Sequence, residues 1–346
     1  MRIGIIGASL PGLVAAKDLM NAGHEVTVME RSRSMGGRMA TMYTGENNQV
    51  PVDYGISYLS SSGKAFSSFL DELREKDIIR QWTDSFGLYD DNQLHAVNPN
   101  SEKGTYYAAP NGMYDVARYL NRWSDIKQNA QAGGLTFFGN DRHKKRPWMI
   151  NMTDFSVYEV DAVIIAVPAI EAYALLQTMQ DETPVRKIIR HIDEVRYDQT
   201  MVLSLSAGKE HQPDWKGLEC NHDSIQWVTN ETSKRPETAD QTILSIYTTD
   251  QFARNYHKQD AEKVKNLLLK QAAPILGDWI HDNQWYALNY WKYFKASNPM
   301  ENSFYEMEME EGPLALIGDY MGGTNIEAAY KSAKDLTDSW ISRYKS

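Results

Sequence analysis

The sequence predicts an α/β protein with a central parallel sheet, flanked by helices, into which a second α+β part is inserted. Two observations predict the parallel sheet. The first is a strand over residues 2–6, a turn at 7–12, a helix over 13–22 and a second strand over 25–30, and the second is a buried strand followed by an amphipathic helix over 312–336. A third observation predicts a mainly antiparallel sheet in the inserted part. Residues 199–208 and 241–250 alternate apolar and polar side chains, as strands with one buried face do.

The composition excludes several classes of protein. The 346 residues are 42% hydrophobic and carry a net charge of −10, so two domains fit and no broad basic surface serves nucleic acid or an anionic membrane. The basic stretch 141–148 is expected to be a solvated turn. No apolar run reaches the about 18–20 residues of a spanning helix, and the N-terminal pattern is that of a folded strand rather than a signal peptide. We therefore expect a cytoplasmic protein.

Neither a metal nor a disulfide is expected. Cys220 is the single cysteine, so the chain has no partner for an internal disulfide and no cysteine-based metal site, which suits a reducing compartment. The eight histidines are scattered without the spacing of metal ligands.

The first turn of the chain has the composition of a phosphate-binding loop with one glycine replaced. Gly7 suits a sharp exit from the first strand, and Gly12 lets the following helix pack close to the sheet. Ser9 occupies the middle position, where its small side chain and hydroxyl can still face a phosphate at the helix N-terminus. Glu30, at the end of the second strand, is placed to accept hydrogen bonds from ribose hydroxyls. A purely structural turn is the alternative.

A nucleophilic role for Ser9 is disfavoured. The stretch G-A-S-L-P lacks the second glycine of the G-x-S-x-G motif that exposes a hydrolase serine on a strand-to-helix turn.

A second glycine-rich stretch follows Glu30. Gly36 and Gly37 offer another close backbone approach, and Arg38 supplies a fixed cation that suits the same pyrophosphate. A flexible loop with an unrelated arginine is the alternative interpretation.

Two later segments add to this pattern. Residues 312–336 are expected to form a buried strand, a Gly-Asp turn at Gly318 and Asp319, and an amphipathic helix. Residues 158–176 resemble a central strand that ends in Ala-Val-Pro.

Together, these segments resemble the cofactor-binding segments of the amine-oxidase-type FAD oxidoreductases, and this implies a Rossmann-like FAD-binding domain. In those proteins E-R-x-x-x-x-G-G-R runs from the ribose to the pyrophosphate, Gly-Asp meets the ribityl chain, and the next helix points at the flavin N1/C2=O2 edge. A positive helix end there stabilises the anionic reduced flavin. The resemblance implies that the bound cofactor is FAD rather than NAD. It implies noncovalent binding, because Cys220 lies far from the C-terminal segment that carries covalent flavin in monoamine oxidases.

The residues expected to contact FAD are Gly7, Ser9, Leu10, Gly12, Glu30, Arg31, Gly36, Gly37, Arg38, Met39, Asp53, Tyr54, Gly55, Ala166, Pro168, Gly318, Asp319, Asn325 and Ile326.

The remaining segments resemble the renalase-like branch of these oxidoreductases. Residues 225–237, with Lys234, Arg235 and Pro236, are similar to its W-x-x-x-x-x-x-K-P-G-R stretch, and 289–299 are similar to its H-R-W-R-Y-A strand. Residues 52–60 and 109–120 resemble D-x-G-A-Q-Y-F-T and P-x-G-M. Two departures, Ser57 for the usual glutamine and Phe294 for the usual alanine, fall where the flavin or substrate is expected, so the substrate could differ.

The renalase resemblance implies oxidation of misreduced dinucleotides, the 2- or 6-dihydro isomers of NAD(P). Hydride passes to flavin N5, and dioxygen takes the electrons to give hydrogen peroxide and NAD(P)⁺. Such a substrate needs no strong base, and the sequence singles out no catalytic acid or base. The alternatives are a FAD-dependent amine oxidase or desaturase acting on another small or polycyclic molecule, and a flavoprotein without catalysis.

The order of the motifs predicts a discontinuous FAD-binding domain over 1–60, 110–170 and 300–346. The substrate domain is expected over 61–109 and 171–299, with helices at 64–76 and 260–275. Its aromatic residues are candidates for stacking on a small-molecule substrate, and burial in the sheet core is the alternative for each. The candidates are Trp227, Trp291 and Tyr293, together with Tyr58 of the preceding FAD-binding segment. Monomer and dimer both stay open.

Overall fold

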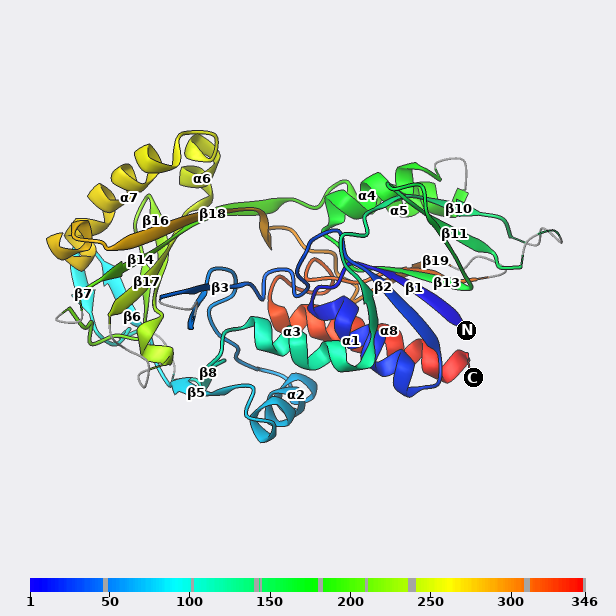
Figure 1. The fold of residues 1–346 in the computed structure, drawn as a ribbon, viewed down its shortest axis with the longest axis horizontal. Coiled ribbons are helices and arrows are strands. Elements are labelled where there is room, and N and C mark those ends of the chain that lie inside the picture. The colour runs from blue at the N-terminus through cyan, green and yellow to red at the C-terminus, as the bar shows by residue number, and fades with distance from the viewer. Residues whose placement is uncertain are drawn as a thin grey trace. The chain divides into compact units, whose positions relative to one another are not determined.

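The structure is a computed structural model that describes residues 1–45, 49–100, 103–139, 143, 145–179, 183–208, 211–235, 241–307 and 312–344. Part of the basic stretch 141–148 lies outside these ranges. The chain forms two compact units, coloured along the sequence in Figure 1. Unit 1 comprises Met1–Gly37, Val116–Tyr197 and Lys295–Ser346, and unit 2 comprises Arg38–Asp115 and Asp198–Phe294.

The compact units and the predicted domains differ at four places. The sequence predicts residues 38–60 and 110–115 in the FAD-binding part, whereas they pack in unit 2. It predicts residues 171–197 and 295–299 in the substrate part, whereas they pack in unit 1. The functional domains stay a prediction.

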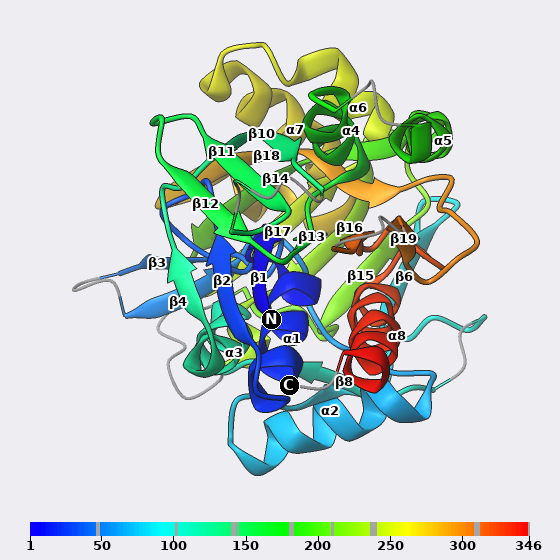
Figure 2. The same cartoon turned by 90° about the vertical axis from the view of Figure 1, so that its right-hand side faces the viewer.

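Unit 1 is built on a mainly parallel sheet with the strand order β19-β20-β13-β1-β2-β9. β1 pairs in parallel with both β13 and β2, and its residues Ile3 and Ile5 are fully buried. Helices α1, α3 and α8 lie on one side of this sheet, and α4, α5 and the β10-β11-β12 sheet lie on the other (Figure 2). Near-continuous apolar strands suit a sheet that is covered on both faces.

The strands of unit 1 are β1 (Arg2–Ile6), β2 (Glu25–Met29), β9 (Asp125–Lys127), β10 (Ala132–Phe137), β11 (Trp148–Met152), β12 (Val157–Val160), β13 (Ala162–Ile165), β19 (Tyr305–Met307) and β20 (Leu314–Leu316). Its helices are α1 (Leu10–Asn21), α4 (Ala169–Gln177), α5 (Thr183–Ile192), α8 (Ile326–Arg343) and the 3₁₀ turn η2 (Asn121–Trp123). Three elements begin in one unit and end in the other: α3 (Tyr114–Leu120), β14 (Tyr197–Ala207) and β18 (Trp285–Ala296).

Two local expectations for unit 1 are corrected by the structure. Helix α1 begins at Leu10 rather than at residue 13, because Ser9 is its N-cap and Pro11 fits the first helical turn. The strand expected at 158–166 is two strands, because the chain changes sheets at Asp161: β12 pairs with β11, whereas β13 pairs with β1.

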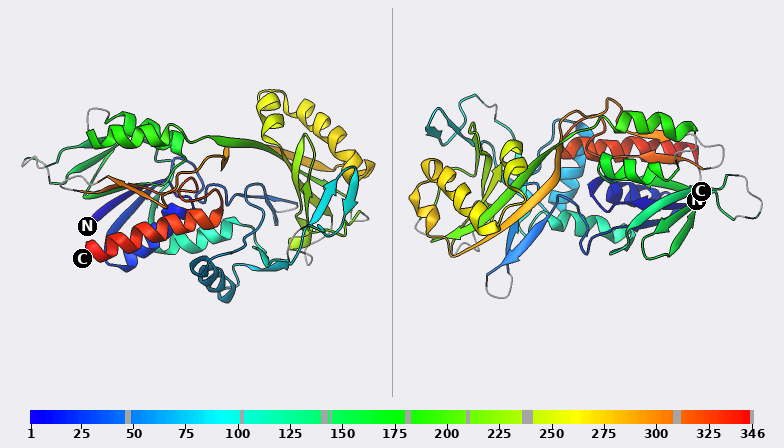
Figure 3. Two further views of the ribbon diagram at one scale, coloured as in Figure 1. Left: turned by 180° about the vertical axis from the view of Figure 1, so that it is seen from behind. Right: turned by 90° about the horizontal axis from the view of Figure 1, so that it is seen from above.

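Unit 2 contains a large sheet with the strand order β18-β14-β17-β16-β15-β6-β7. Apart from the parallel pair of β15 and β6, the described pairs in it are antiparallel. Helices α6 and α7 cover one face of this sheet (Figure 3). Leu244 and Ile246 of β17 pack there against Val264 and Leu268 of α7. The predicted α/β class, with one parallel and one mainly antiparallel sheet, is confirmed.

The strands of unit 2 are β3 (Thr41–Thr44), β4 (Val50–Asp53), β5 (Arg80–Thr83), β6 (Gly87–Asp90), β7 (Gln93–His95), β8 (Tyr106–Ala108), β15 (Gly217–Cys220), β16 (Ile225–Asn230), β17 (Thr242–Thr248) and β18 (Trp285–Ala296). Its helices are α2 (Lys64–Glu75), α6 (Asp250–Tyr256), α7 (Ala261–Leu276) and the 3₁₀ turns η3 (Thr232–Lys234) and η5 (Asp278–His281). The helices predicted at 64–76 and 260–275 are therefore confirmed. Along the described ranges, no helix combines the length and apolar character that crossing a membrane requires.

Candidate functional site

The turn between β1 and α1 requires both of its glycines. Gly7 has φ +105°, and a Cβ there would lie 2.6 Å from the Ala166 carbonyl oxygen. A Cβ on Gly12 would lie 2.1 Å from the Gly7 carbonyl oxygen. Both distances are shorter than any side chain tolerates, so the close approach of α1 to the sheet depends on these two residues.

Ser9 binds the protein backbone in this structure. Its hydroxyl donates to the Ala166 carbonyl oxygen at 3.0 Å. The hydrogen bond that the sequence predicts to a phosphate oxygen is therefore made instead to the backbone at the end of β13. As the N-cap of α1, Ser9 makes no side-chain hydrogen bond to the first helical turn. The helix N-terminus is therefore not capped by its own serine, which suits an anion there.

The two glycine-rich loops of unit 1 lie against each other. The Gly36 amide donates to the Ala8 carbonyl at 2.7 Å, and a Cβ on Gly37 would lie 3.2 Å from the Ser9 Cβ. Gly37 has φ +55°, so glycine suits both its conformation and its contact with Ser9. A glycine at position 9 would leave space between the two loops. Because Gly37 also has no side chain, it leaves part of that space beside Ser9.

Glu30 follows β2 and holds two backbone amides. One carboxylate oxygen accepts from the Ala8 amide at 3.0 Å and the other from the Ser32 amide at 2.8 Å. Each oxygen has a second lone pair, so ribose hydroxyls can still be accepted. The neighbouring Arg31 is more than half exposed and forms an ion pair with Glu171 at 2.9 Å.

The C-terminal segment meets the same edge of the sheet. Gly7, Ala166 and Gly318 follow β1, β13 and β20, three neighbouring parallel strands. The Gly318 amide donates to the Ser332 hydroxyl at 3.0 Å, and Asn325 caps α8 by accepting from the Ala328 amide at 2.8 Å. Ligands of open α/β sheets bind outside the carboxyl ends of the strands, where the strand order reverses. Unit 1 therefore fits the dinucleotide part of FAD.

The Ser9 hydroxyl carries the first testable prediction. We expect Ser9→Ala to weaken FAD binding about fivefold, because one hydrogen bond that ties the turn to β13 is lost. Titration of the FAD-free protein measures this, with Ser68→Ala as the control, since Ser68 makes an equivalent bond to the Lys64 carbonyl in exposed α2. An unchanged FAD affinity in Ser9→Ala would show that the hydroxyl does not hold the β1–α1 turn in the conformation that binds FAD.

In unit 2, two short segments pair by their backbones. The Ile56 amide donates to the Arg38 carbonyl at 2.8 Å, and the Tyr54 amide donates to the Ala40 carbonyl at 3.1 Å. A Cβ on Gly55 would lie 1.9 Å from the Arg38 carbonyl oxygen, so this pairing needs glycine there. Between them, Met39 is 1% exposed. The Arg38 guanidinium, expected at the pyrophosphate, donates here to the Phe294 carbonyl at 2.5 Å.

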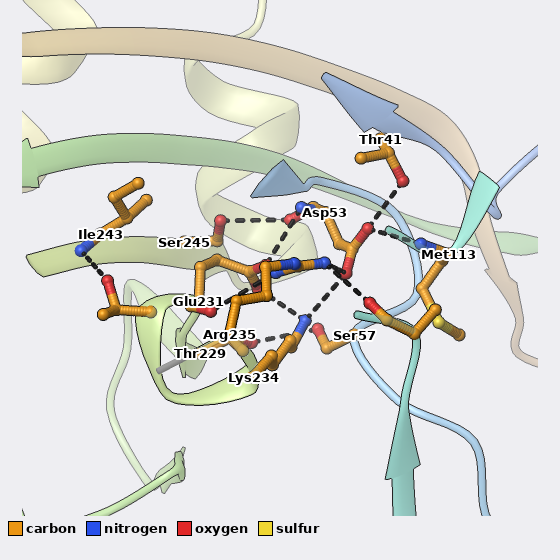
Figure 4. Close-up of polar contacts among 12 residues, drawn as sticks. Thr41, Asp53, Ser57, Met113, Thr229, Glu231, Lys234, Arg235, Ile243 and Ser245 are labelled. Atoms are coloured by element: carbon orange, nitrogen blue, oxygen red, sulfur yellow. Dashed lines mark hydrogen bonds and ion pairs between the residues drawn. The ribbon is translucent and has the colours of Figure 1, made fainter. Parts of the chain in front are cut away.

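Asp53 lies in a buried ion cluster that the sequence analysis did not foresee (Figure 4). Its partners are Glu231, Lys234 and Arg235, and the four side chains are at most 2% exposed. Lys234 contacts Asp53 at 3.2 Å and Glu231 at 2.7 Å, and Arg235 contacts them at 2.8 and 3.0 Å. We call these four residues the ion cluster. Its two anions and two cations balance, as burial of charge requires.

Backbone and hydroxyl groups complete the ion cluster. Thr41 and the Met113 amide donate to Asp53 at 2.7 and 2.8 Å, and Arg235 donates to the carbonyls of Pro110 and Ala109. The resemblance had drawn attention to Lys234 and Arg235 without giving them a role, and Pro236 lies outside the described residues. Glu231 was missed, although its spacing of three and four residues from the two cations is that of paired side chains on one helical turn.

The ion cluster lowers the pKa of Asp53. Burial by itself would raise that pKa, but Lys234 and Arg235, with the hydrogen bonds from Met113 and Thr41, lower it to about 2. The folded protein therefore holds Asp53 charged at a pH where the unfolded chain has already taken up a proton.

This pKa predicts how stability depends on pH. A depressed carboxyl pKa contributes stability above about pH 4 that is lost as the pH falls toward 2, and the shift corresponds to about 2 kcal/mol. We expect the difference in free energy of unfolding between wild type and Asp53→Asn, measured in urea, to be constant from pH 7 to 5 and to shrink below pH 4. A difference that stays constant down to pH 2.5 would contradict this.

Three of the four substrate-pocket candidates lie on one face of the large sheet of unit 2, and Tyr58 lies in the loop between β4 and α2. Side chains alternate along each strand, and Leu288 of β18 and Val228 of β16 belong to the core beneath α7. Trp291 and Tyr293 of β18 and Trp227 of β16 therefore occupy the opposite face. All three are half-buried, as is Tyr58.

These aromatic residues form two ring groups. Trp227 and Tyr58 pack together at 5.8 Å between ring centroids, in a cluster with Phe86 and Tyr106. Trp291 stacks on Tyr54 at 5.7 Å with an interplanar angle of 22°, and its indole N–H donates to the Tyr54 carbonyl.

The ring of Tyr293 is contacted by the Lys292 ammonium, which lies 5.1 Å from the ring centroid.

Ser57, which stands where the resemblance leads one to expect glutamine, joins a hydroxyl network. The Trp227 indole N–H and the Thr229 hydroxyl donate to Ser57 at 3.2 and 3.1 Å, and Ser57 donates to the Tyr247 hydroxyl at 3.1 Å. Burial is the largest cause that raises the pKa of Tyr247 well above its usual value, so this phenol stays protonated. Thr229 and Tyr247 were not predicted, because nothing local in the sequence connects the strands β16 and β17 with the loop that carries Ser57.

Comparison with known proteins places these features in a family. The family model described as flavin containing amine oxidoreductase matches residues 99–336, and that described as NAD(P)-binding Rossmann-like domain matches residues 5–73. Solved structures share the fold over 99% of this chain.

Three of those structures illustrate the likeness. A protein of Exiguobacterium sp. 255-15 with a provisional protoporphyrinogen oxidase assignment has a TM-score of 0.77 at 11% identity, with 99% of its chain covered. Putrescine oxidase bound to putrescine has a TM-score of 0.72 at 14% identity, with 100% of its chain covered. The cyclohexylamine oxidase of Brevibacterium oxydans IH-35A has a TM-score of 0.73 at 10% identity, with 99% of its chain covered.

Curated relatives match over shorter stretches. The flavin-dependent L-tryptophan oxidase RebO of Lentzea aerocolonigenes is 32% identical over 28% of this chain and 20% of its own. The L-amino-acid oxidase of Siganus canaliculatus is 32% identical over 36% of this chain and 22% of its own. The 4,4'-diapophytoene desaturase of Staphylococcus haemolyticus is 29% identical over 34% of this chain and 27% of its own. The chain thus spans 20% to 27% of the length of these relatives. Because the family model covers well over half of the residues, the chain belongs to the flavin-containing amine oxidoreductase family, and its cofactor is FAD.

Proposed function

We propose that the protein is a FAD-dependent oxidase of misreduced dihydronicotinamide dinucleotides, the 2- or 6-dihydro isomers of NAD(P). The observation that carries the proposal is the character of the sheet face with Trp227, Trp291 and Tyr293. It offers half-buried rings and hydroxyl groups, and the charged residues of the ion cluster beside it neutralise one another. Such a face suits a flat, uncharged dihydropyridine ring that needs no base to give up a hydride.

We assign FAD to the residues that the sequence predicts, apart from Asp53, whose carboxylate is occupied by Thr41, Met113, Lys234 and Arg235. Gly7, Gly12 and Glu30 are assigned to the dinucleotide part. Binding is proposed to be noncovalent. Burial, with the charge of Glu219, raises the pKa of the Cys220 thiol to about 12, so a reactive thiolate is not available there.

The chemistry that FAD supplies when bound is acceptance of a hydride and delivery of both electrons to dioxygen, which gives hydrogen peroxide. The protein's own residues bind and orient. The ring edges of Trp227 and Tyr58 are proposed to hold the substrate ring flat, and Ser57, Thr229 and Tyr247 keep the indole of Trp227 in one orientation. Orientation of this kind lowers the barrier to transfer without a titrating group.

A second candidate, oxidation of an amine or amino acid or desaturation of a polycyclic molecule, is favoured by the relatives. An amino acid needs a cation for its carboxylate. Arg38 donates to the Phe294 carbonyl and Arg235 belongs to the ion cluster, so neither of these two guanidinium groups is poised for that role. An uncharged amine or hydrocarbon would avoid this objection.

Anaerobic reduction of the bound flavin tests the proposal. Purified protein should show the bands of oxidised FAD near about 375 and 450 nm. Bleaching by 2- or 6-dihydro-NAD(P), but not by putrescine or L-tryptophan, would support the leading function. Bleaching by an amine alone would favour the second candidate, and bands that none of these donors changes would favour a flavoprotein without catalysis.

A further inference from the structure

The segment from Asp53 to Ser57 is held along its whole length. The Tyr54 and Ile56 amides donate to the backbone of the 38–40 segment, and the Trp291 indole donates to the Tyr54 carbonyl at 2.7 Å. Gly55 has no room for a side chain against Arg38. This segment contains Tyr54 and Gly55, two residues assigned to FAD above.

The two ends of the segment are held by polar networks. Ser57 sits in the hydroxyl network with Trp227, Thr229 and Tyr247. Asp53 sits in the ion cluster, and its amide donates to Glu231 at 3.1 Å. The ion cluster is buried, and so are Ser57, Thr229 and Tyr247 of the hydroxyl network, so solvent competes little with these hydrogen bonds.

The Asp53 carboxylate has no capacity left for a ligand. One oxygen accepts from Thr41 and Met113, and the other accepts from Lys234 and Arg235. Four donors fill the about four lone-pair sites of a carboxylate. The side chain is also 0% exposed.

The ion cluster joins stretches that are distant in the sequence. Through Arg235 and Asp53 it connects strand β4, the 109–113 segment and turn η3. Arg80 and Trp82 of β5 hold the same turn from the other side: Arg80 donates to the Lys234 carbonyl at 2.7 Å, and Trp82 donates to Ser233 at 2.9 Å.

We propose that Asp53 is a positioning residue and not a FAD ligand: the ion cluster sets the backbone of residues 54–57, and this segment in turn shapes the surroundings of the flavin. The proposal rests on the proposed function only for the assignment of Tyr54 and Gly55 to FAD. The effect of the ion cluster on the segment is independent of that assignment.

A substitution of Lys234 changes the charge of the ion cluster and leaves the Asp53 side chain itself unaltered. Its ammonium contacts Asp53 and Glu231 and lies 5.5 Å from the Trp82 ring centroid. Lys234→Met leaves two anions with one cation, while the Asp53 carboxylate stays in place. Adding Glu231→Gln restores the balance, because the new side-chain amide can keep its oxygen toward the Asp53 N–H and Arg235, and the acceptor that is lost served Lys234.

The experiment compares Lys234→Met, the double variant Glu231→Gln/Lys234→Met and the control Lys103→Met. Lys103 forms an exposed ion pair with Asp84 in the same unit. Hydrogen exchange of the Tyr54 and Ile56 amides is measured on the full chain without FAD, with Ile246 of β17 as the reference amide. FAD affinity and the visible circular dichroism of the bound flavin are measured at saturation.

We expect Lys234→Met to speed exchange at Tyr54 and Ile56 about tenfold relative to Ile246 and to weaken FAD binding about tenfold. The flavin dichroism should change, and the double variant should bring all three measurements back to within about threefold of wild type. Lys103→Met should match wild type.

Three results would overturn the proposal: unchanged exchange at Tyr54 and Ile56 in Lys234→Met, a uniform rise over unit 2 that includes Ile246, or no recovery in the double variant. Faster exchange together with unchanged FAD affinity and dichroism would also overturn it, because the segment would then move without consequence for the flavin. A wild-type protein that binds no FAD would overturn the proposed function instead, and the exchange measurements alone would then decide whether the ion cluster positions residues 54–57.

Discussion

Gly12→Ala is expected to weaken FAD binding by at least about 100-fold, which corresponds to about 2.7 kcal/mol. The new methyl would lie 2.1 Å from the Gly7 carbonyl oxygen, in the turn that we assign to the pyrophosphate, and 3.2 Å from the Ala166 Cβ at the end of β13. Helix α1 must move away from the sheet to make room, and its N-terminal amides move with it. The higher helix propensity of alanine, about 1 kcal/mol, does not offset this displacement. Titration of the FAD-free protein measures the loss.

Gly133→Ala is the matched control for that substitution. A methyl at Gly133 would meet the Thr153 methyl at 3.3 Å, and this contact relaxes by a small side-chain shift. We expect this variant to bind FAD as the wild type does. If Gly12→Ala binds FAD within about threefold of wild type, the β1–α1 turn is not the pyrophosphate site.

Lys234→Met is expected to lower the free energy of unfolding by about 3–5 kcal/mol, because it leaves a buried, uncompensated negative charge on Asp53 and Glu231. The methionine has a similar length, so lost volume contributes little. Urea unfolding at pH 7, followed by far-UV circular dichroism, measures the change.

The double variant Glu231→Gln/Lys234→Met separates charge from packing. It should recover more than half of the lost stability, since one anion and one cation are removed together and Arg235 keeps Asp53 as its partner. Lys103→Met, at an exposed ion pair, should change the free energy of unfolding by less than about 0.5 kcal/mol. A double variant less stable than Lys234→Met would mean that hydrogen bonding by Glu231, rather than charge balance, dominates.

The features that the sequence predicted well are local. The strands over residues 2–6 and 25–29 and the helices α2 and α7 follow from periodicity within a few turns of chain, and Gly7 and Gly12 follow from the geometry of one tight approach of helix to strand. The predictions that needed correction concern boundaries: α1 begins three residues earlier than expected, and a strand expected to be continuous divides at Asp161. A boundary depends on capping and on which sheet the chain joins next, and periodicity carries little information about either.

Two side chains show what local patterns cannot decide. Ser9 occupies a position in the sequence that predicts a phosphate contact, yet its hydroxyl donates to the carbonyl of Ala166, 157 residues further along the chain. Asp53 belongs to a motif that suggested cofactor binding, yet its carboxylate is filled by donors from Thr41, Met113, Lys234 and Arg235. In both cases the partner is brought close only by the fold.

The sequence by itself determined the fold class, the order of the cofactor-binding motifs and the flavin family, because glycine placement and hydrophobic periodicity act over short distances along the chain. Only the tertiary structure decided which charged and hydroxyl groups neutralise one another. The ion cluster and the Ser57 network draw on segments separated by well over a hundred residues, and a buried charge or hydroxyl takes its properties from the partners that surround it in space.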